Sequence, residues 1–192
     1  MRIIAGTLRG RRLNPPANLP VRPTTDMARE SLFNILNNYV DYEQCQVMDM
    51  FSGTGAVAVE FISRGASSVT VVDINSQCTD YIRSECQRLN IGNLQVVRAD
   101  VFDLIKRLSS NKMGMSTGFG TKYDIIFADP PYAMTELASL PDLVFDGNLL
   151  SDDGIFILEH PREFDFESHA HFWQHRAYGK VNFSFFANKF DQ

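Results

Sequence analysis

Short apolar runs alternate along this chain with longer segments in which apolar residues recur at helical spacing. The apolar runs are rich in β-branched and aromatic residues, as is typical of strands buried in a sheet, and they fall at residues 47–51, 69–73, 94–100, 125–127 and 154–159. The helical segments between and around them fall at residues 26–39, 56–64, 75–90 and 101–108. Strands that alternate with helices predict an α/β protein with a doubly wound, mostly parallel sheet.

The two ends of the chain depart from this alternation. Residues 172–173 and 181–186 form a pattern of two antiparallel strands joined near Gly179, after a segment at 137–150 that we expect to be partly helical. At the N-terminus, residues 3–7 and 11–13 predict two short strands around a glycine-bearing turn, followed by several prolines that exclude regular structure. We therefore expect a hairpin arm over residues 1–23 and one domain over residues 24–192.

Composition is that of an ordinary globular protein, with 192 residues of which 44% are hydrophobic and 21% charged. No apolar run approaches the roughly 18 residues that a membrane span requires, and Met1-Arg2-Ile3-Ile4 does not lead into a secretory segment. We expect a cytoplasmic monomer. The three cysteines, Cys45, Cys78 and Cys86, contain no Cys-x-x-Cys pair, which favours buried free thiols.

The charge is unevenly distributed although its sum is −5. Residues 1–31 hold six arginines against two acidic residues, a net charge of +4, so the rest of the chain carries −9. Arginine suits forked contact with phosphate, and a basic arm on an acidic body is a pattern of proteins that meet nucleic acid with one face. The alternative is a solvated N-terminus whose charges bind nothing specific. The arginines are Arg2, Arg9, Arg11, Arg12, Arg22 and Arg29.

A glycine-bearing turn, Phe51-Ser52-Gly53-Thr54-Gly55, follows the first buried strand and precedes a segment of helix formers. Glycines at such a turn let a ligand approach the backbone at a helix N-terminus. Asp73 ends the next strand, where its carboxylate can accept hydrogen bonds from ribose hydroxyls, with Ile74 beside it. Asp100 ends the third strand and can accept from an adenine amine, with the Val101 amide next to it.

This pattern also satisfies the dinucleotide fingerprint, since Gly53-x-Gly55-x-x-Ala58 is followed by Asp73 some twenty residues later. A nicotinamide-dependent enzyme is therefore a competing hypothesis. Asp49 counts against it, because an acidic residue inside the first strand suits a site for a methyl donor better than a site for a pyrophosphate.

The run Tyr123 to Ala128 ends abruptly at Asp129-Pro130-Pro131-Tyr132. Prolines cannot donate to a sheet ladder and restrict the residue before them, so this strand end is stiff. It presents a carboxylate, a Pro130 carbonyl outside any ladder and an aromatic face, the groups needed to hold a planar base with an exocyclic amine. A strand that ends in a simple Pro-Pro turn is the structural alternative.

Three histidines, His169, His171 and His175, lie close together in the sequence, and an extended strand would put them on one face. No cysteine or paired carboxylate joins them, so no metal site is expected.

The strand-end residues together resemble the class I S-adenosylmethionine-dependent methyltransferases, and Asp129-Pro130-Pro131-Tyr132 resembles their amino-methylating branch. The N-terminal block and the glycine turn narrow the likeness to the bacterial RsmD family, which methylates guanine N2 in 16S ribosomal RNA. The motifs that carry this resemblance are Arg2-Ile3-Ile4-Ala5-Gly6, Gly10-Arg11-Arg12-Leu13, Arg22-Pro23-Thr24-Thr25-Asp26, Arg29-Glu30, Leu32-Phe33-Asn34, Asp49-x-Phe51-x-Gly53-x-Gly55, Ser63-Arg64-Gly65-Ala66 and Tyr178-Gly179.

The resemblance implies a seven-stranded sheet with an antiparallel C-terminal strand, S-adenosylmethionine as cofactor and 16S rRNA as partner. The implied residues are, for catalysis, Asp129, Pro130, Pro131 and Tyr132; for the cofactor, Asp49, Phe51, Ser52, Gly53, Gly55, Asp73, Ile74, Asp100 and Val101; and for RNA, Arg2, Arg9, Arg11, Arg12 and Arg22. Two features depart from the family: the segment 109–122 is long, and Tyr132 stands where many relatives carry Phe. The alternatives are adenine-N6 methylation of DNA and a noncatalytic RNA-binding factor for ribosome assembly.

Overall fold

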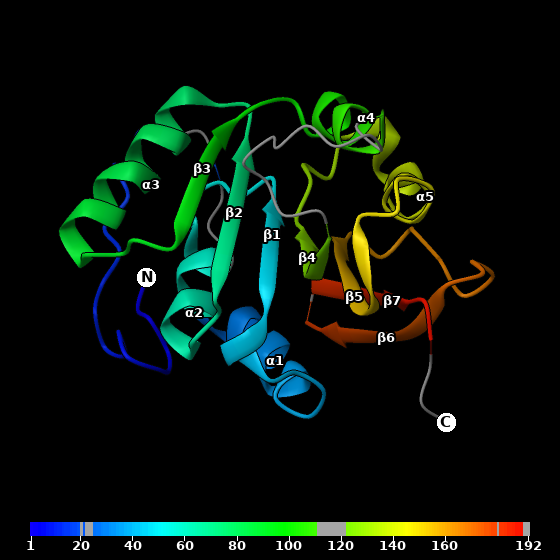
Figure 1. The fold of residues 1–192 in the computed structure, drawn as a ribbon, viewed down its shortest axis with the longest axis horizontal. Coiled ribbons are helices and arrows are strands. Elements are labelled where there is room, and N and C mark those ends of the chain that lie inside the picture. The colour runs from blue at the N-terminus through cyan, green and yellow to red at the C-terminus, as the bar shows by residue number, and fades with distance from the viewer. Residues whose placement is uncertain (20, 22–24, 111–121, 180, 190–192) are drawn as a thin grey trace.

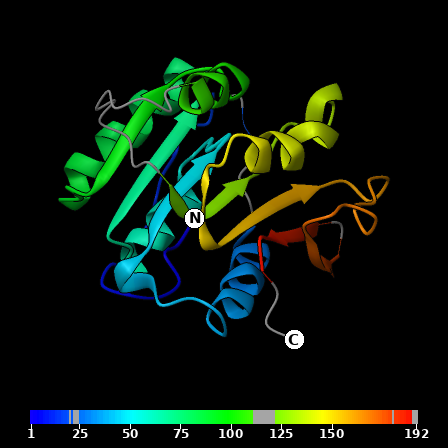
Figure 2. The ribbon, with the colours of Figure 1, turned by 45° about the vertical axis from the view of Figure 1, so that its right-hand side comes forward.

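A single twisted sheet organises the molecule, and its seven strands lie in the order β3-β2-β1-β4-β5-β7-β6 (Figures 1 and 2). The structure is a computed structural model, and it describes residues 1–19, 21, 25–110, 122–179 and 181–189. In that part of the chain β7 alone runs antiparallel to the other strands. The bounds are β1 Gln46–Met50, β2 Ser68–Asp73, β3 Leu94–Arg98, β4 Tyr123–Ala128, β5 Leu150–His160, β6 Phe172–Tyr178 and β7 Val181–Ala187.

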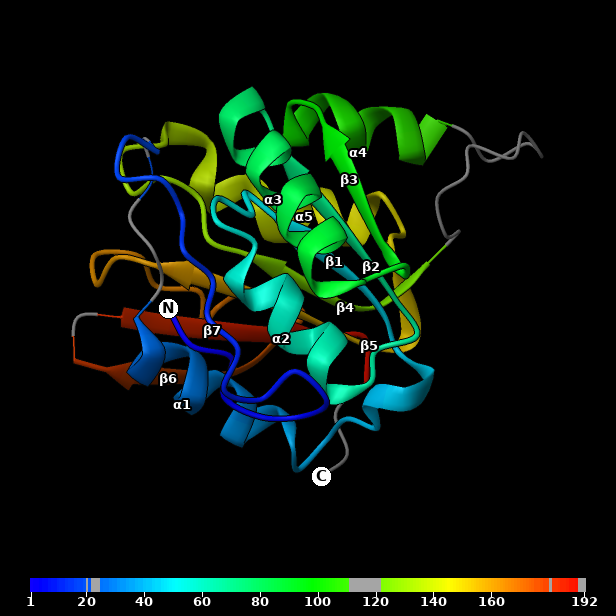
Figure 3. The ribbon, with the colours of Figure 1, turned by 90° about the vertical axis from the view of Figure 1, so that its left-hand side faces the viewer.

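Helices cover both faces of the sheet because each buried strand is apolar on both sides. In β1, Val47 packs with residues of α1, α2 and α3, whereas its neighbour Met48 packs with residues of α4 and α5 on the other face (Figure 3). The helices are α1 Asp26–Leu36, α2 Ala56–Arg64, α3 Ser76–Leu89, α4 Val101–Ser110 and α5 Leu140–Asp146, and two short 3-10 helices are η1 Tyr42–Gln44 and η2 Thr135–Ser139.

The strand order reverses between β1 and β4, which are parallel neighbours with Met50 opposite Ala128. In open α/β sheets, ligands bind outside the carboxyl ends of the strands at such a switch point. The predicted fold class, including the antiparallel C-terminal strand, is thus confirmed. The carboxyl edge of the sheet is the place to look for a site.

Two element boundaries differ from the predicted ones. The first helix was expected to reach Tyr39 but ends at Leu36, because the amides of Asn38 and Tyr39 donate to carbonyls only three residues back, those of Ile35 and Leu36. Tyr39 then packs edge-on against Trp173. The third strand ends at Arg98, and the Asp100 that was assigned to it begins the next helix. Residues 111–121, the centre of the long segment 109–122, lie outside the described residues.

The N-terminal hairpin exists, although an isolated antiparallel bridge between Arg2 and Arg12 takes the place of two strands. The Ile3 amide donates to the Arg11 carbonyl at 2.9 Å, and the Gly10 amide donates to the Ile3 carbonyl at 2.9 Å. Ile3 and Leu13 are fully buried and share an apolar cluster with residues of α2 and α3. The hairpin is therefore packed onto the body. A domain boundary at residue 23 stays a prediction.

The hairpin runs alongside α2 (Figure 3), and two polar side chains of that helix hold it in place. The buried Glu60 carboxylate accepts from the Ile4 amide at 2.8 Å and from the Ala5 amide at 3.0 Å. Ser63 accepts from the Leu8 amide with its hydroxyl and from the Thr7 amide with its carbonyl. Because the hairpin tip lies against Ser63, near the C-terminal end of α2, the tip is at the end of the sheet opposite the carboxyl edge.

The histidines do not share a strand face, so that expectation was wrong. His169 and His171 precede β6; His169 contacts Asp142 at 3.1 Å, and His171 stacks on Phe145. His175 lies within β6 and contacts Asn182 at 3.2 Å. The described residues contain no group of three or more His, Cys, Asp or Glu side chains placed to hold a metal ion.

The three cysteines are buried free thiols, as predicted. Among the residues that the structure describes, no helix is both long enough and apolar enough to cross a bilayer.

Candidate active site

The glycine turn between β1 and α2 has a backbone that few residues could adopt. Phe51, Gly53 and Gly55 have φ angles of 60°, 53° and 69°, all in the left-handed region that favours glycine. A Cβ on Gly55 would lie 2.9 Å from Cγ1 of Ile82 in α3. Gly55 is therefore required both by its conformation and by the close approach of α3.

Asp73 anchors this turn from the end of β2. Its Oδ2 accepts from the Gly53 amide at 2.8 Å and its Oδ1 accepts from the Asn75 amide at 2.8 Å. The side chain of Ile74, beside it, is 64% exposed. The predicted ribose ligand thus holds the turn as well, and each oxygen keeps a second lone pair for a hydroxyl donor.

Asp49 is a buried carboxylate that its surroundings satisfy only in part. It is 2% exposed in β1, and its Oδ2 has no hydrogen-bond partner in the described part of the chain. Burial raises the pKa of its carboxyl well above the usual value; the nearby Asp129 raises it further, the Ala58 backbone amide lowers it, and Asp73 adds to the increase. A buried acid that faces two other carboxylates suits a cationic ligand.

Asp100 lies between β3 and α4 and caps that helix. Its Oδ1 accepts from the amides of Phe102 at 2.9 Å and Asp103 at 3.1 Å, while Val101 is buried in the core behind it. Both of these cap bonds use the same carboxylate oxygen. Phe51 and Phe102 approach edge to face from the two sides of this region, with ring centroids 6.5 Å apart.

The Asp-Pro-Pro-Tyr segment follows β4 directly beside the glycine turn. The Asp129 amide reaches the Met50 carbonyl, the last of β1, at 3.5 Å, so Asp129 adjoins the start of the turn. The Met134 amide donates to the Pro131 carbonyl at 2.8 Å, whereas no described residue donates to the Pro130 carbonyl. Tyr132 is 44% exposed, and its hydroxyl donates to Oε1 of Glu159 in β5 at 3.2 Å.

The structure brings the predicted cofactor and catalytic residues to one edge of the sheet. Ser52 also belongs there, since its amide and its hydroxyl both donate to the Val72 carbonyl at 3.1 Å. Two residues near the site were missed: Glu159, which fixes Tyr132, and Val21, whose side chain would lie 3.7 Å from a Cβ on Gly53. Glu159 could have been found, because it comes near the carboxyl end of a predicted strand.

The structure agrees only in part with the predicted basic arm. Arg2, Arg9, Arg11 and Arg12 are exposed on the hairpin. Arg29, counted among the cations of the arm, is completely buried and donates to the Arg2 carbonyl and to Asp26, so it cannot reach phosphate. Arg22 lies outside the described residues.

The strand order, the glycine turn and the acid-proline-proline-tyrosine segment at the switch point define a class I methyltransferase fold. Methyltransferases of this class use S-adenosylmethionine as cofactor, and the donor set fits it. A buried, unpartnered carboxylate oxygen on Asp49 suits a positively charged group, and the exposed apolar side chain of Ile74 suits the face of an adenine.

Comparisons with known proteins agree with this class. A family model described as "Conserved hypothetical protein 95" matches residues 1–187. "Ribosomal RNA small subunit methyltransferase D" of Escherichia coli K12 is 33% identical over 159 residues, which cover 83% of this chain and 74% of that protein. "Putative rRNA methyltransferase YlbH" of Bacillus subtilis is 33% identical over 164 residues, covering 85% of this chain and 84% of that protein.

A solved structure, "Putative methyltransferase yhhF from Escherichia coli", superposes with a TM-score of 0.79 at 28% identity and covers 97% of this chain and 96% of that one. The chain belongs to the RsmD family of methyltransferases. The competing hypothesis of a nicotinamide-dependent enzyme is thereby wrong.

Proposed function

We propose that this protein transfers a methyl group to the exocyclic N2 amine of a guanine in the 16S rRNA of the bacterial small ribosomal subunit. The observation that carries the proposal is the placement of Asp129, the Pro130 carbonyl and Tyr132 beside the glycine turn and the buried Asp49. The relatives named as rRNA methyltransferases support the class of substrate.

The sulfonium of S-adenosylmethionine supplies an electrophilic methyl group. Asp73 and Asp100 bind the adenosine part of the cofactor, and Asp49 stabilises the cationic methionine part. The remaining lone pair on each Asp73 oxygen and the second Asp100 oxygen support these roles. The backbone at Phe51 to Gly55, with its two glycines, lets the cofactor approach closely.

On the substrate side, a guanine lifted from its stack lies on the exposed ring of Tyr132. The Asp129 carboxylate and the Pro130 carbonyl accept the two hydrogens of the amine, which aims its lone pair toward the methyl group. As the bond from the methyl group to nitrogen forms and its bond to sulfur breaks, positive charge would develop on the amine nitrogen, where the Asp129 carboxylate would stabilise it. S-adenosylhomocysteine would leave, and the methylated amine would release one proton to water. The Glu159 carboxylate fixes the tyrosine ring through its hydroxyl.

Substitution of Asp129 tests the proposal. Small-subunit particles that lack the modification are incubated with labelled S-adenosylmethionine, and the nucleosides are identified after digestion. We expect N2-methylguanosine from the wild type and a drop in kcat of about 10²–10³ or more for Asp129→Ala, because a charge-stabilising group is lost. Donor affinity should remain within about twofold of the wild type.

Asp103→Ala serves as the matched control, because Asp103 is an exposed aspartate on α4 whose nearest ion-pair partner is Lys106 at 3.9 Å. It should leave both quantities unchanged. Near wild-type transfer by Asp129→Ala would contradict the role of that residue. N6-methyladenosine in DNA, or RNA affinity without methyl incorporation, would replace the proposed function by one of its alternatives.

A further inference from the structure

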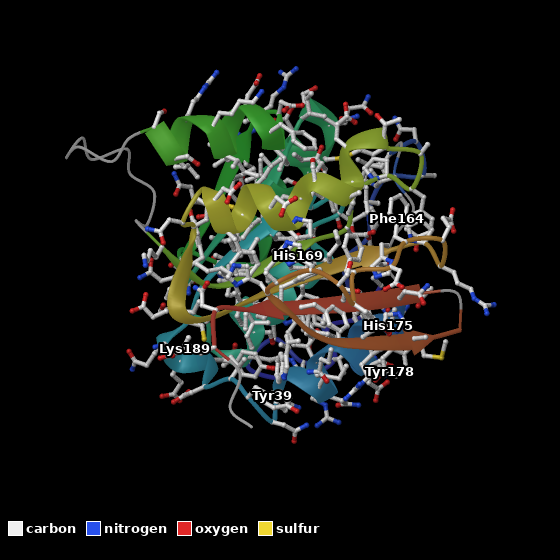
Figure 4. The ribbon with its side chains drawn as sticks, turned by 90° about the vertical axis from the view of Figure 1, so that its right-hand side faces the viewer. Tyr39, Phe164, His169, His175, Tyr178 and Lys189 are labelled. Carbon is white, nitrogen blue, oxygen red and sulfur yellow. The ribbon has the colours of Figure 1, made fainter. Side chains whose placement is uncertain are left out.

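A cavity opens near the edge of the sheet that lies away from the cofactor residues. It has a volume of about 700 Å³, within the range of pockets that hold small organic groups. It lies over the β6–β7 hairpin, on the face of the sheet that α4 and α5 cover. Figure 4 shows Phe164 and His175, two of its lining residues, toward the same end of that hairpin.

The flat walls of this cavity are aromatic. Phe164 and Phe166 lie nearly parallel, with an interplanar angle of 8° and centroids 6.3 Å apart, and Phe172 lines another side. Phe166 also meets the buried ring of His160 edge-on at 5.1 Å. The cavity therefore offers faces on which a planar group can stack.

The polar groups of the cavity form an ordered donor and acceptor pair. The Oδ1 of Asn182, which can only accept, lies 3.2 Å from Nε2 of His175, so that nitrogen donates. The His175 imidazole lines the cavity beside the Asn182 amide, whose nitrogen carries two N–H donors. The buried His160 holds Ser184 in position, since its Nε2 lies 2.8 Å from the Ser184 hydroxyl.

One strand connects this cavity to the proposed active site. In β5, Glu159 holds Tyr132 on one face of the sheet, and the next residue, His160, holds Ser184 on the other. β7 is two strands away from β4 in the sheet, a lateral distance of about 10 Å at the usual strand spacing. A flexible polymer held at Tyr132 can therefore reach around the sheet edge into the cavity.

We propose that this cavity binds an unstacked nucleobase of the substrate RNA, close in the chain to the guanine that is methylated. This inference rests on the proposed function. Single-stranded RNA is recognised by stacking of its bases on aromatic rings and by hydrogen bonds to their edges, and the cavity presents both. The lining holds Asp165 and Glu167, which oppose phosphate, and Arg162, which attracts it, and this acidic excess favours entry of a neutral base over entry of the phosphate backbone.

Two substitutions at exposed positions of β6 test this site without emptying the core. Ala177→Trp places an indole in the cavity, and His175→Ala removes the imidazole from its lining. We expect each to raise the KM for the rRNA substrate, by about tenfold for Ala177→Trp, since stacking of one base contributes a factor of about 5 to 150. The kcat and the dissociation constant for S-adenosylmethionine should stay within twofold of the wild type.

Gln95→Trp is the control, because it puts the same indole at an exposed position of β3, the opposite edge strand. It should leave the KM unchanged. A second measurement uses rRNA fragments that carry 4-thiouridine near the target guanine. We expect photo-crosslinks to cavity residues such as Phe164 or Phe172, and their loss in Ala177→Trp.

The outcomes separate this site from the proposed function. If the wild type transfers methyl groups to rRNA but Ala177→Trp matches it in KM, in RNA affinity and in crosslinks, the cavity is not a nucleobase site and the proposed function stands. If the effect appears on ribosomal particles and is absent on naked rRNA, the occupant is a protein and the inference is overturned. If the wild type transfers no methyl group to rRNA, the proposed function fails, and RNA affinity and crosslinking decide on the cavity alone.

Discussion

The two halves of the carboxyl edge satisfy their polar groups in different ways. Around β2 and β3, the protein's own backbone amides occupy oxygens of the strand-end carboxylates, because Asp73 ties Gly53 to Asn75 and Asp100 caps α4, whereas Asp49 of β1 keeps one oxygen without a partner among the described residues. Around β4 to β7, the prominent groups are aromatic and open to solvent, with Tyr132 44% exposed and a cavity over the β6–β7 hairpin.

This difference fits the two kinds of ligand that a methyltransferase binds. A small cofactor is best bound by a rigid site whose residues are held in position before binding. A large and irregular RNA needs aromatic faces that remain accessible. The comparison predicts that substitutions in the first half change donor binding, whereas substitutions in the second half change the handling of RNA.

Gly55→Ala should have the largest effect and tests the rigidity of the first half. The new Cβ would lie 2.9 Å from Cγ1 of Ile82 at a φ angle of 69°, so the turn or α3 must move. We expect the affinity for S-adenosylmethionine, measured by calorimetry, to fall at least a hundredfold while RNA binding persists. Gly179→Ala, at a positive φ in open space, is the control. Unchanged donor affinity would mean that the turn is not the cofactor site.

Tyr132→Ala is the corresponding change in the second half. The loss of a stacking face should lower kcat/KM for rRNA by about 10- to 100-fold and leave donor affinity unchanged. Tyr132→Phe keeps the ring and loses the hydrogen bond to Glu159, so it should cost only a few-fold. An equal loss for Tyr132→Phe and Tyr132→Ala would show that the hydroxyl matters and the ring does not.

The sequence predicted the first half of the edge better than the second. A glycine turn and an acid at a strand end are local signals, because backbone conformation and strand direction place those residues whatever surrounds them. The same reasoning found the Asp-Pro-Pro-Tyr segment, whose prolines stiffen it locally. It also found the sheet and its antiparallel C-terminal strand.

The features that it missed depend on contacts between distant parts of the chain. In the sequence Glu60 is an ordinary helix residue, yet its carboxylate accepts hydrogen bonds from two hairpin amides that lie 55 and 56 positions earlier in the chain. Arg29 looks like a surface cation and is buried under the arm. His175 joins Asn182 only because the last two strands pair. No local pattern carries such information, since tertiary packing determines it.

Asp49→Asn, in the first half, should change the stability of the protein and its affinity for the methyl donor in opposite directions. The substitution removes a buried negative charge that faces Asp129 and Asp73, so we expect the thermal midpoint to rise, by about 2–4 °C for each 1 kcal/mol gained. Affinity for the cationic donor should fall about tenfold. A lower midpoint together with full donor affinity would contradict both assignments.

The pH dependence of the same pair of proteins gives a sharper test. Since folding raises the pKa of Asp49, the stability from its protonated carboxyl is complete below the unfolded-state pKa of about 4 and is lost as pH rises through the folded-state pKa. The wild type should therefore lose stability relative to Asp49→Asn as pH increases from 4. Its donor affinity should rise over the same interval, because the ionised carboxylate binds the cation.

Arginine substitutions on the hairpin should have the smallest effects, and they test whether RNA contacts the first half at all. The hairpin packs on α2 and α3, so RNA held by it would have to span both halves. Arg2 and Arg12 pair across the bridge, whereas Arg9 lies at the tip against the far end of α2.

We expect Arg2→Ala with Arg12→Ala to weaken rRNA binding several-fold and to flatten its salt dependence by about one unit of slope per phosphate contact. Arg9→Ala should have less effect, because the tip is remote from the carboxyl edge. Equal salt slopes for all variants and the wild type would confine RNA to the second half and leave the hairpin as a structural element.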